Sequence, residues 1–263
     1  MSSIAAAPHI FWAVLFIVLP LLIVIVYAFT DPEGAFTLEN VNSLKDYVSI
    51  FGLSIELSVI ATFICLLIGY PLAYIIARSK PQHQKIYIML LMLPMWTNLL
   101  IRTYSIMAIL DDGGFINTIL GTSFHIVGTK GAVIFGMVYD FLPYMVLPIY
   151  TCVSKIDKHM WEVASDLGCN TFTTLTKVIF PLSLSGIISG VTMVFVPSIS
   201  TFYISQKLGG GSFDLLGDVI ERQFKNAVTY HTGAAISLVM MILILISVAV
   251  MNRFSDGEEG PVV

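Results

Sequence analysis

The chain has 263 residues, of which 57% are hydrophobic and only 11% are charged. A soluble domain carries about 25% charged residues, so this composition indicates a membrane protein. The net charge of −4, without a basic tail, gives no sign of a nucleic-acid partner. The three cysteines lack disulfide or CxxC spacing and no HExxH motif occurs, so we expect free thiols and no metal or cofactor bound by this chain. The cysteines are Cys65, Cys152 and Cys169.

Six apolar stretches are long enough to cross a bilayer as helices, each of which needs about 20 residues. The first is too long for the core of a signal peptide and no cleavage site follows it, so we expect it to remain as a span. The sequence therefore predicts an all-α integral membrane protein with six transmembrane helices in a single domain, residues 1–263. The predicted spans are 9–29, 56–77, 86–110, 131–152, 183–204 and 233–251.

The distribution of basic residues predicts the orientation of the spans. The linker 78–85 and the loop 153–182 hold three Lys or Arg residues each, whereas the short loops on the opposite side hold Lys45 and Lys130 alone. Positively charged loops stay in the cytoplasm, so we expect both termini to be cytoplasmic. The loop 205–232 on the other side also carries three basic residues, which weakens this assignment.

Prolines interrupt the predicted spans. Each removes one backbone hydrogen bond, and the freed carbonyl must face protein or a water-filled cavity because lipid cannot satisfy it. The set therefore favours helices that line a transport pathway, although any one proline can simply kink its helix. These residues are Pro71, Pro94, Pro143, Pro148 and Pro197.

Residues 161–181, WEVASDLGCNTFTTLTKVIFP, form a polar segment between two apolar spans. Asp157 is a suitable N-cap and Gly168 a suitable C′ residue for a helix over Lys158–Leu167. Four apolar residues of this helix, at i, i+3, i+4 and i+7, form one stripe. So short a helix must dock on something, and we favour a protein groove over the membrane surface. The stripe consists of Met160, Val163, Ala164 and Leu167.

The segment resembles the EAA loop of ABC importer permeases, which reads E-A-A, three residues, G, nine residues, then I-x-L-P. Glu162, Ala164, Gly168 and Pro181 match at the expected spacing, whereas Val163, Val178 and Phe180 replace Ala, Ile and Leu. The resemblance implies the type I ABC importer permease fold. It also implies that the loop is a coupling helix whose contacts with an ATPase involve Glu162, Ala164, Asp166, Gly168 and Pro181.

Two further segments, LPMWTNLLIRTYS at 93–105 and GMVYDFLPYMVLPIY at 136–150, resemble a permease subunit of spermidine/putrescine importers. This resemblance implies a bacterial inner-membrane protein that transports polyamines. The implied partners are a second homologous permease, an ATPase dimer that binds ATP and Mg, an external polyamine-binding protein, and membrane lipid. The chain itself has no Walker A sequence, so we expect it not to be an enzyme.

Charged side chains are costly inside the membrane and usually have a partner or a function. We expect Asp140 to lie on the pathway of a cationic solute together with nearby aromatic and amide side chains, because ring faces attract ammonium groups. The alternative is that Asp140 pairs with Arg102 or with a partner subunit. The other candidate pathway residues are Trp96, Asn98, Tyr104, Tyr139 and Tyr203.

Other functions remain open at this point. An ABC importer permease with the same features can carry another solute, such as another organic cation, an iron complex or an oxyanion. A secondary transporter in which Asp140 relays protons would need no ATPase, but the paired interrupted helices in repeated halves that are typical of that class are not evident. A passive membrane scaffold would leave the EAA spacing unexplained.

Overall fold

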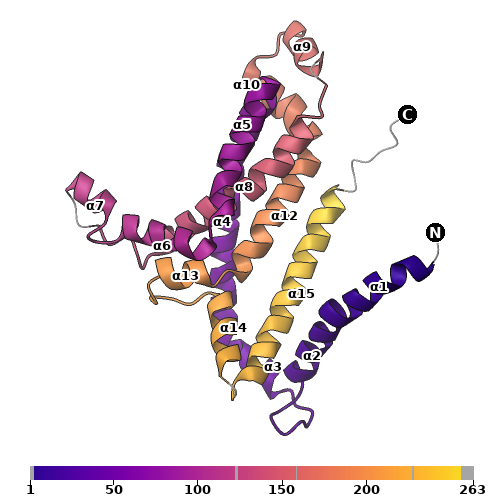
Figure 1. Cartoon of the computed structure of the whole chain (residues 1–263), viewed down its shortest axis with the longest axis vertical. Helices are drawn as coiled ribbons and strands as arrows, with labels where there is room; N and C mark the ends of the chain where they lie inside the picture. Colours follow the sequence, from indigo (N-terminus) through magenta and orange to yellow (C-terminus); the bar gives the residue numbers. More distant parts are fainter. Residues whose placement is uncertain (1–2, 122–123, 158, 227, 256–263) are drawn as a thin grey trace.

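A computed structural model describes residues 3–121, 124–157, 159–226 and 228–255. These residues form helices, turns and one isolated β-bridge between Thr30 and Phe36, with no strand among them. The predicted all-α class is therefore confirmed. The long helices run along the long axis of the molecule, with α9 (His159–Asp166) at one end and α3 (Glu39–Asn42) at the other (Figure 1).

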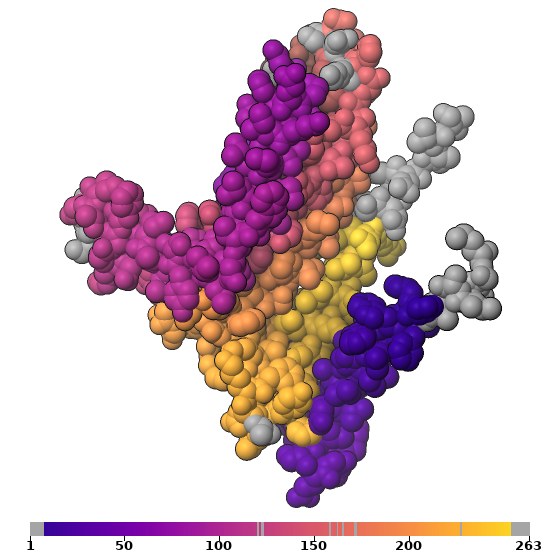
Figure 2. Space-filling view, viewed as in Figure 1, coloured from indigo at the N-terminus to yellow at the C-terminus, as the bar shows by residue number. Residues whose placement is uncertain are grey.

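The N-terminal segment is apolar and largely uncovered. It comprises α1 (Ser3–Ala13), the π-helix η1 (Val14–Val18) and α2 (Leu19–Ala28). Nearly all its described side chains are exposed, and it packs on α15 (Tyr230–Ser255) around the buried Ala28. The segment flanks α15 at the edge of the molecule (Figure 2). An apolar surface of this size is typical of a membrane or subunit contact.

Three helices form the centre of the fold, and α4 (Val48–Arg78) packs against both α8 (Lys130–Val153) and α12 (Leu184–Ser200). In a membrane, helices associate through close packing, which small residues permit. At Gly190 of α12, an added Cβ would lie 2.9 Å from the sulfur of Met145 and 3.0 Å from its carbonyl oxygen. Glycine at this position therefore lets α12 approach α8 closely.

The predicted span 86–110 is not one straight helix. It divides into α5 (Pro81–Met92) with the 3-10 turn η3 (Leu93–Trp96), and α6 (Leu99–Leu110), which leads to α7 (Phe115–Leu120). The two parts are bent by 92°. Pro94 lies just before the bend, and the Asn98 side chain accepts a hydrogen bond from the Leu100 amide at 2.8 Å, which starts a new helix.

The segment after the polar loop is also bent. It contains α10 (Thr171–Thr174), the π-helix η4 (Leu175–Ile179) and α11 (Phe180–Leu182). The part over Leu175–Leu182 meets α12 at an angle of 69°. The predicted span 183–204 is wrong at its end, because α12 stops at Ser200 and α13 (Tyr203–Leu208) starts a separate helix. Then follow α14 (Leu216–Lys225) and α15, which runs back toward the end where α9 lies (Figure 1).

Among the described residues, four helical segments are long and apolar enough to cross a membrane, and the number rises to six if each bent pair is one span. The division of residues 1–263 into six spans stays a prediction for the two bent pairs. The prolines behave differently from one another: Pro71, Pro143 and Pro148 lie inside continuous helices, whereas Pro94 lies at a break. The four segments are Pro8–Ala28, Glu39–Arg78, Lys130–Val153 and Tyr230–Arg253.

Candidate functional site

The helix α9 has the caps that its sequence predicts. Oδ1 of Asp157 accepts a hydrogen bond from the His159 amide at 3.0 Å, and bonds from His159 hold the pKa of Asp157 below its ordinary value. Gly168 has φ +78°, and the amide of Cys169 donates to the carbonyl of Ala164 at 2.9 Å. This is the Schellman arrangement at a helix C-terminus. The predicted start at Lys158 lies outside the described residues.

The apolar stripe of α9 is divided between two faces. Ala164 is only 4% exposed and turns toward the rest of the chain, whereas Met160, Val163 and Leu167 are exposed, Leu167 to 77%. The expectation of one apolar docking face is thus corrected: residues 160, 163 and 167 form an outer face that this chain does not cover. A partner surface would bury that outer face.

Three further residues, Glu162, Asp166 and Pro181, are predicted to contact the ATPase. The side chain of Glu162 lies outside the described part of the structure, so its contact stays a prediction. Asp166 is exposed on the last turn of α9, and Pro181 is exposed in α11, before the 69° bend. The motif therefore extends from the exposed helix to the bend that begins α12.

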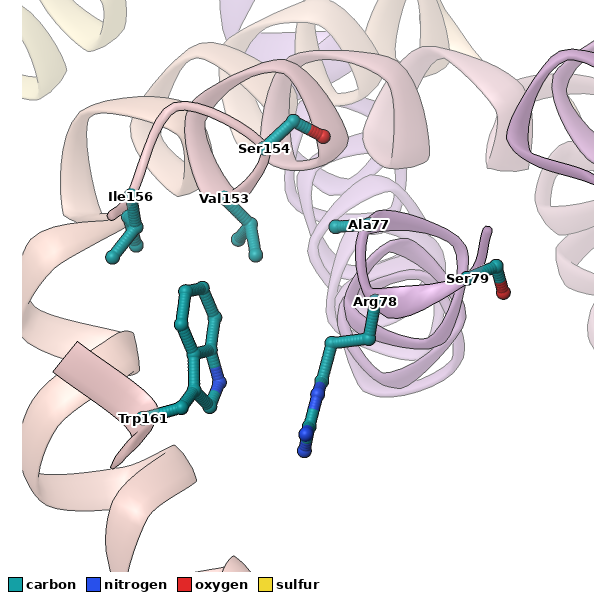
Figure 3. A pocket seen from close by; sticks show the side chains of 7 residues that line it. All are labelled: Ala77, Arg78, Ser79, Val153, Ser154, Ile156 and Trp161. Carbon is teal, nitrogen blue, oxygen red and sulfur yellow. The ribbon is translucent and has the colours of Figure 1, made fainter. Parts of the chain in front are cut away.

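Trp161 connects α9 to the ends of the central helices. Its ring points into a cavity of about 280 Å³ between the ends of α4 and α8, where it faces Val153 and Ile156 on one side and Arg78 across the space (Figure 3). The ring also packs on the large core cluster that contains Ile149 and Val153. Sequence reasoning missed this role, because Trp161 precedes the residues that define the motif.

Gln84 joins three helices close to Trp161. Its Nε2 donates to the carbonyl oxygens of Ala77 and Ser79 at 2.9 and 2.8 Å, and its Oε1 accepts from the hydroxyl of Tyr150 at 3.1 Å. The carbonyls at the C-terminus of α4 would otherwise lack partners. Gln84 therefore fixes α5 to α4 and α8 at the end of the bundle that carries α9.

The bend before α12 is held by α4. The hydroxyl of Tyr70 lies 3.1 Å from Oγ of the buried Ser183, and that Oγ donates to the carbonyl of Phe180 at 3.1 Å. The rings of Tyr70 and Phe180 also lie 5.4 Å apart. A displacement of α11 is thus linked to α4 and to the start of α12 through specific contacts.

Asp140 and Arg102 form an ion pair across α8 and α6, with Nε of Arg102 against Oδ1 of Asp140. Asp140 is 1% exposed, and the guanidinium also donates to the Pro94 carbonyl at 2.7 Å. The alternative in which these two charges pair with each other is therefore the arrangement in the structure. The ion pair lies at the 92° bend and ties α6 to η3 and α8.

The aromatic residues predicted for the pathway fall into separate places. Tyr104 of α6 and Tyr203 of α13 meet edge to face, with ring centroids 6.2 Å apart. Tyr139 is exposed, and its ring centroid lies 5.9 Å from the guanidinium carbon of Arg102. Trp96 is 72% exposed, and Asn98 caps α6. Only Tyr104 and Tyr203 form a directly contacting pair among these residues in the part of the chain that the structure describes.

An open groove of about 620 Å³ runs between α8 and α12. Its wall combines the ring of Tyr144, three hydroxyl groups and the ammonium group of Lys155 with apolar side chains such as Leu147 and Pro148. Sequence reasoning missed this groove, because it depends on how α8 and α12 pack. The hydroxyls of Thr151 and Ser189 donate to carbonyls of their own helices, at 2.8 and 2.9 Å. Six of its lining residues are Tyr144, Thr151, Lys155, Ser185, Ser189 and Met193. Nowhere in the described ranges do three or more His, Cys, Asp or Glu residues form a possible metal site.

Known proteins share this arrangement of helices. The chain of a bacterial ABC transporter involved in the import of the acidic polysaccharide alginate superimposes with a TM-score of 0.76 at 16% identity, over 96% of this chain and 94% of that one. A chain of the MetNI methionine ABC transporter gives a TM-score of 0.60 at 15% identity, over 80% of this chain and 94% of that one. These likenesses establish the type I ABC importer permease fold.

Some curated proteins are more similar to this chain in sequence than these solved structures are. The spermidine/putrescine transport system permease protein PotB of Haemophilus influenzae is 36% identical over 256 residues, 92% of this chain and 90% of that protein. PotB of Escherichia coli strain K12 is also 36% identical, over 93% of this chain and 94% of its own length. The model of the family described as "Binding-protein-dependent transport system inner membrane component" matches residues 2–257. The chain belongs to this family of multi-pass inner-membrane permease subunits and is similar to PotB.

Proposed function

We propose that this chain is a membrane permease subunit of an ATP-driven importer of polyamines such as spermidine and putrescine. The observation that carries the cargo assignment is 36% identity over nine-tenths of the chain to permeases named for spermidine/putrescine transport. In this proposal the chain is not an enzyme: it forms part of the pathway, and a partner subunit binds ATP and Mg and hydrolyses the nucleotide.

Coupling to that partner is assigned to α9. The exposed face of Met160, Val163 and Leu167 enters a groove of the ATPase, where an amphipathic helix can bury its apolar side. Movement of the ATPase then reaches the bundle through Trp161, between α4 and α8, and through the bend at Ser183. Both termini and α9 lie on the cytoplasmic side in this proposal.

The pathway is assigned to the aromatic pair Tyr104–Tyr203 and to the groove between α8 and α12. Aromatic faces attract ammonium groups, and Trp96 and Tyr139 offer further exposed rings. Asp140 is proposed to hold the bend through Arg102 instead of contacting the solute. A second homologous permease covers the open side of the pathway, and an external binding protein delivers the polyamine.

The test is uptake of radiolabelled spermidine and putrescine by cells that lack all other polyamine importers and express the complete complex. We expect accumulation that depends on this chain and that an excess of unlabelled polyamine suppresses. The same cells are offered an oxyanion and an iron complex. Uptake of one of these in place of polyamine would keep the permease class and overturn the cargo.

A further inference from the structure

Lys207 places a positive charge on the aromatic pair assigned to the pathway. It lies one helical turn after Tyr203 on α13, so both side chains project from the same face of that helix. Its Nζ is 5.0 Å from the ring centroid of Tyr104 and 5.8 Å from that of Tyr203. Both distances are within the range of about 6 Å over which a ring attracts a cation.

The contacts around Lys207 come mainly from the two tyrosines. No carboxylate within the described ranges forms an ion pair with Lys207. The nearby acidic residue on α14, Glu221, is bonded instead by Gln206 at 3.2 Å and by Lys225. Within the described ranges, the ammonium group of Lys207 therefore has the two tyrosines as its neighbours, their rings and the hydroxyl of Tyr104, and forms no ion pair.

The rings belong to the two segments that follow broken helices. Tyr104 is on α6, after the 92° bend, and Tyr203 begins α13, directly after α12 ends at Ser200. Tyr104, Tyr203 and Lys207 therefore form a contact between α6 and α13. A solute that binds to the rings must remove or share the ammonium group that bridges them.

We propose that Lys207 is a resident cation that a cationic solute must displace from Tyr104 and Tyr203, so that it determines the affinity of this part of the pathway. The inference rests on the proposed polyamine transport. Two ammonium groups on one ring pair repel each other, so the resident charge weakens binding of the incoming one. A neutral side chain of similar length removes the competitor and keeps the apolar stem.

The experiment measures equilibrium binding of radiolabelled spermidine to the complete membrane complex in nanodiscs, without the external binding protein. We expect Lys207→Met to bind spermidine about 2- to 5-fold more tightly than wild type, and Lys207→Arg to bind as wild type does. Lys130→Met is the matched control, because Lys130 is exposed and pairs with Glu56 at 3.8 Å without touching a ring. In a Tyr104→Leu, Tyr203→Leu background, Lys207→Met should gain nothing.

Equal affinity of wild type and Lys207→Met, or an equal gain in Lys130→Met, would overturn the inference. Absence of measurable binding in both wild type and Lys207→Met would overturn it as well. In each case, spermidine uptake by cells with the wild-type complex would leave the proposed function standing. Absence of that uptake would overturn the proposed function and, with it, the role of Lys207.

Discussion

Arg102 and Asp140 form a buried ion pair between α6 and α8, and the same guanidinium donates to the carbonyl of Pro94 at 2.7 Å. One side chain therefore connects both sides of the 92° bend to a third helix. The carbonyl of Pro94 also accepts from the amide and hydroxyl of Thr97, at 3.2 and 2.6 Å. The carbonyl of Pro94, at the break, is thus satisfied inside the protein, as lipid requires.

Removing one member of the pair should destabilise the protein. Arg102→Met leaves a buried carboxylate without its partner, which typically costs about 3–5 kcal/mol, and Asp140→Asn should act in the same direction. The measurement is the thermal midpoint of the purified complex together with uptake. We expect both to fall in the single variants and both to recover in the double variant Arg102→Met, Asp140→Leu. Normal stability of Asp140→Asn with several-fold lower uptake would instead place Asp140 on the pathway.

Trp161 should couple α9 to the bundle. Trp161→Ala removes the contact between α9 and the ends of α4 and α8. Movement of the ATPase should then be transmitted less effectively to the pathway. We expect basal ATP hydrolysis to persist and its stimulation by solute-loaded binding protein to fall several-fold. Trp12→Ala is the control, because Trp12 is exposed on α1. Equal loss of stimulation in both variants would argue against a specific role for Trp161.

The C-terminal turn of α9 should not tolerate a side chain at Gly168. Its φ of +78° disfavours any L-residue, and a β-branched side chain there costs on the order of 1–3 kcal/mol of local strain. We predict that Gly168→Val inserts normally but lowers stimulated ATP hydrolysis. Gly52→Val is the comparison, since Gly52 lies in a helix with open space around its Cβ position. Wild-type stimulation in Gly168→Val would contradict the coupling assignment.

Cysteine labelling of intact cells tests the proposed orientation. Cysteines placed at Glu33 and at Gln82, both exposed, should react differently with an impermeant thiol reagent applied to intact cells. We expect the Glu33 position to react, because the proposed orientation puts it in an outer loop, and the Gln82 position to resist until the membrane is opened. The partly exposed Cys152 and Cys169 are first replaced by serine. The reverse pattern would place α9 on the outside.

Local sequence patterns predicted α9 well, because its caps depend on residues within the segment itself. Asp157 and Gly168 take the roles that their types favour. The bends were not predictable in the same way. Pro143 and Pro148 lie inside the continuous α8, whereas Pro94 precedes a break, and the difference depends on distant partners such as Arg102 and Asp140.

The site was predicted only in part for a related reason. Residue type identified Tyr104 and Tyr203 as possible cation contacts, but their meeting depends on how α6 and α13 turn after the breaks. The same turn brings Lys207 to the rings. The exposed outer face of α9 likewise follows from how Trp161 and Ala164 are buried against the chain, which periodicity alone does not determine.

The most direct test of the central claim is spermidine accumulation in proteoliposomes that contain the complete complex, with the external binding protein on the outside and ATP on the inside. The account predicts accumulation that requires internal ATP with Mg and that is lost when this chain carries Gly168→Val. Accumulation that needs no ATP and follows an imposed proton gradient would contradict it and identify a secondary transporter.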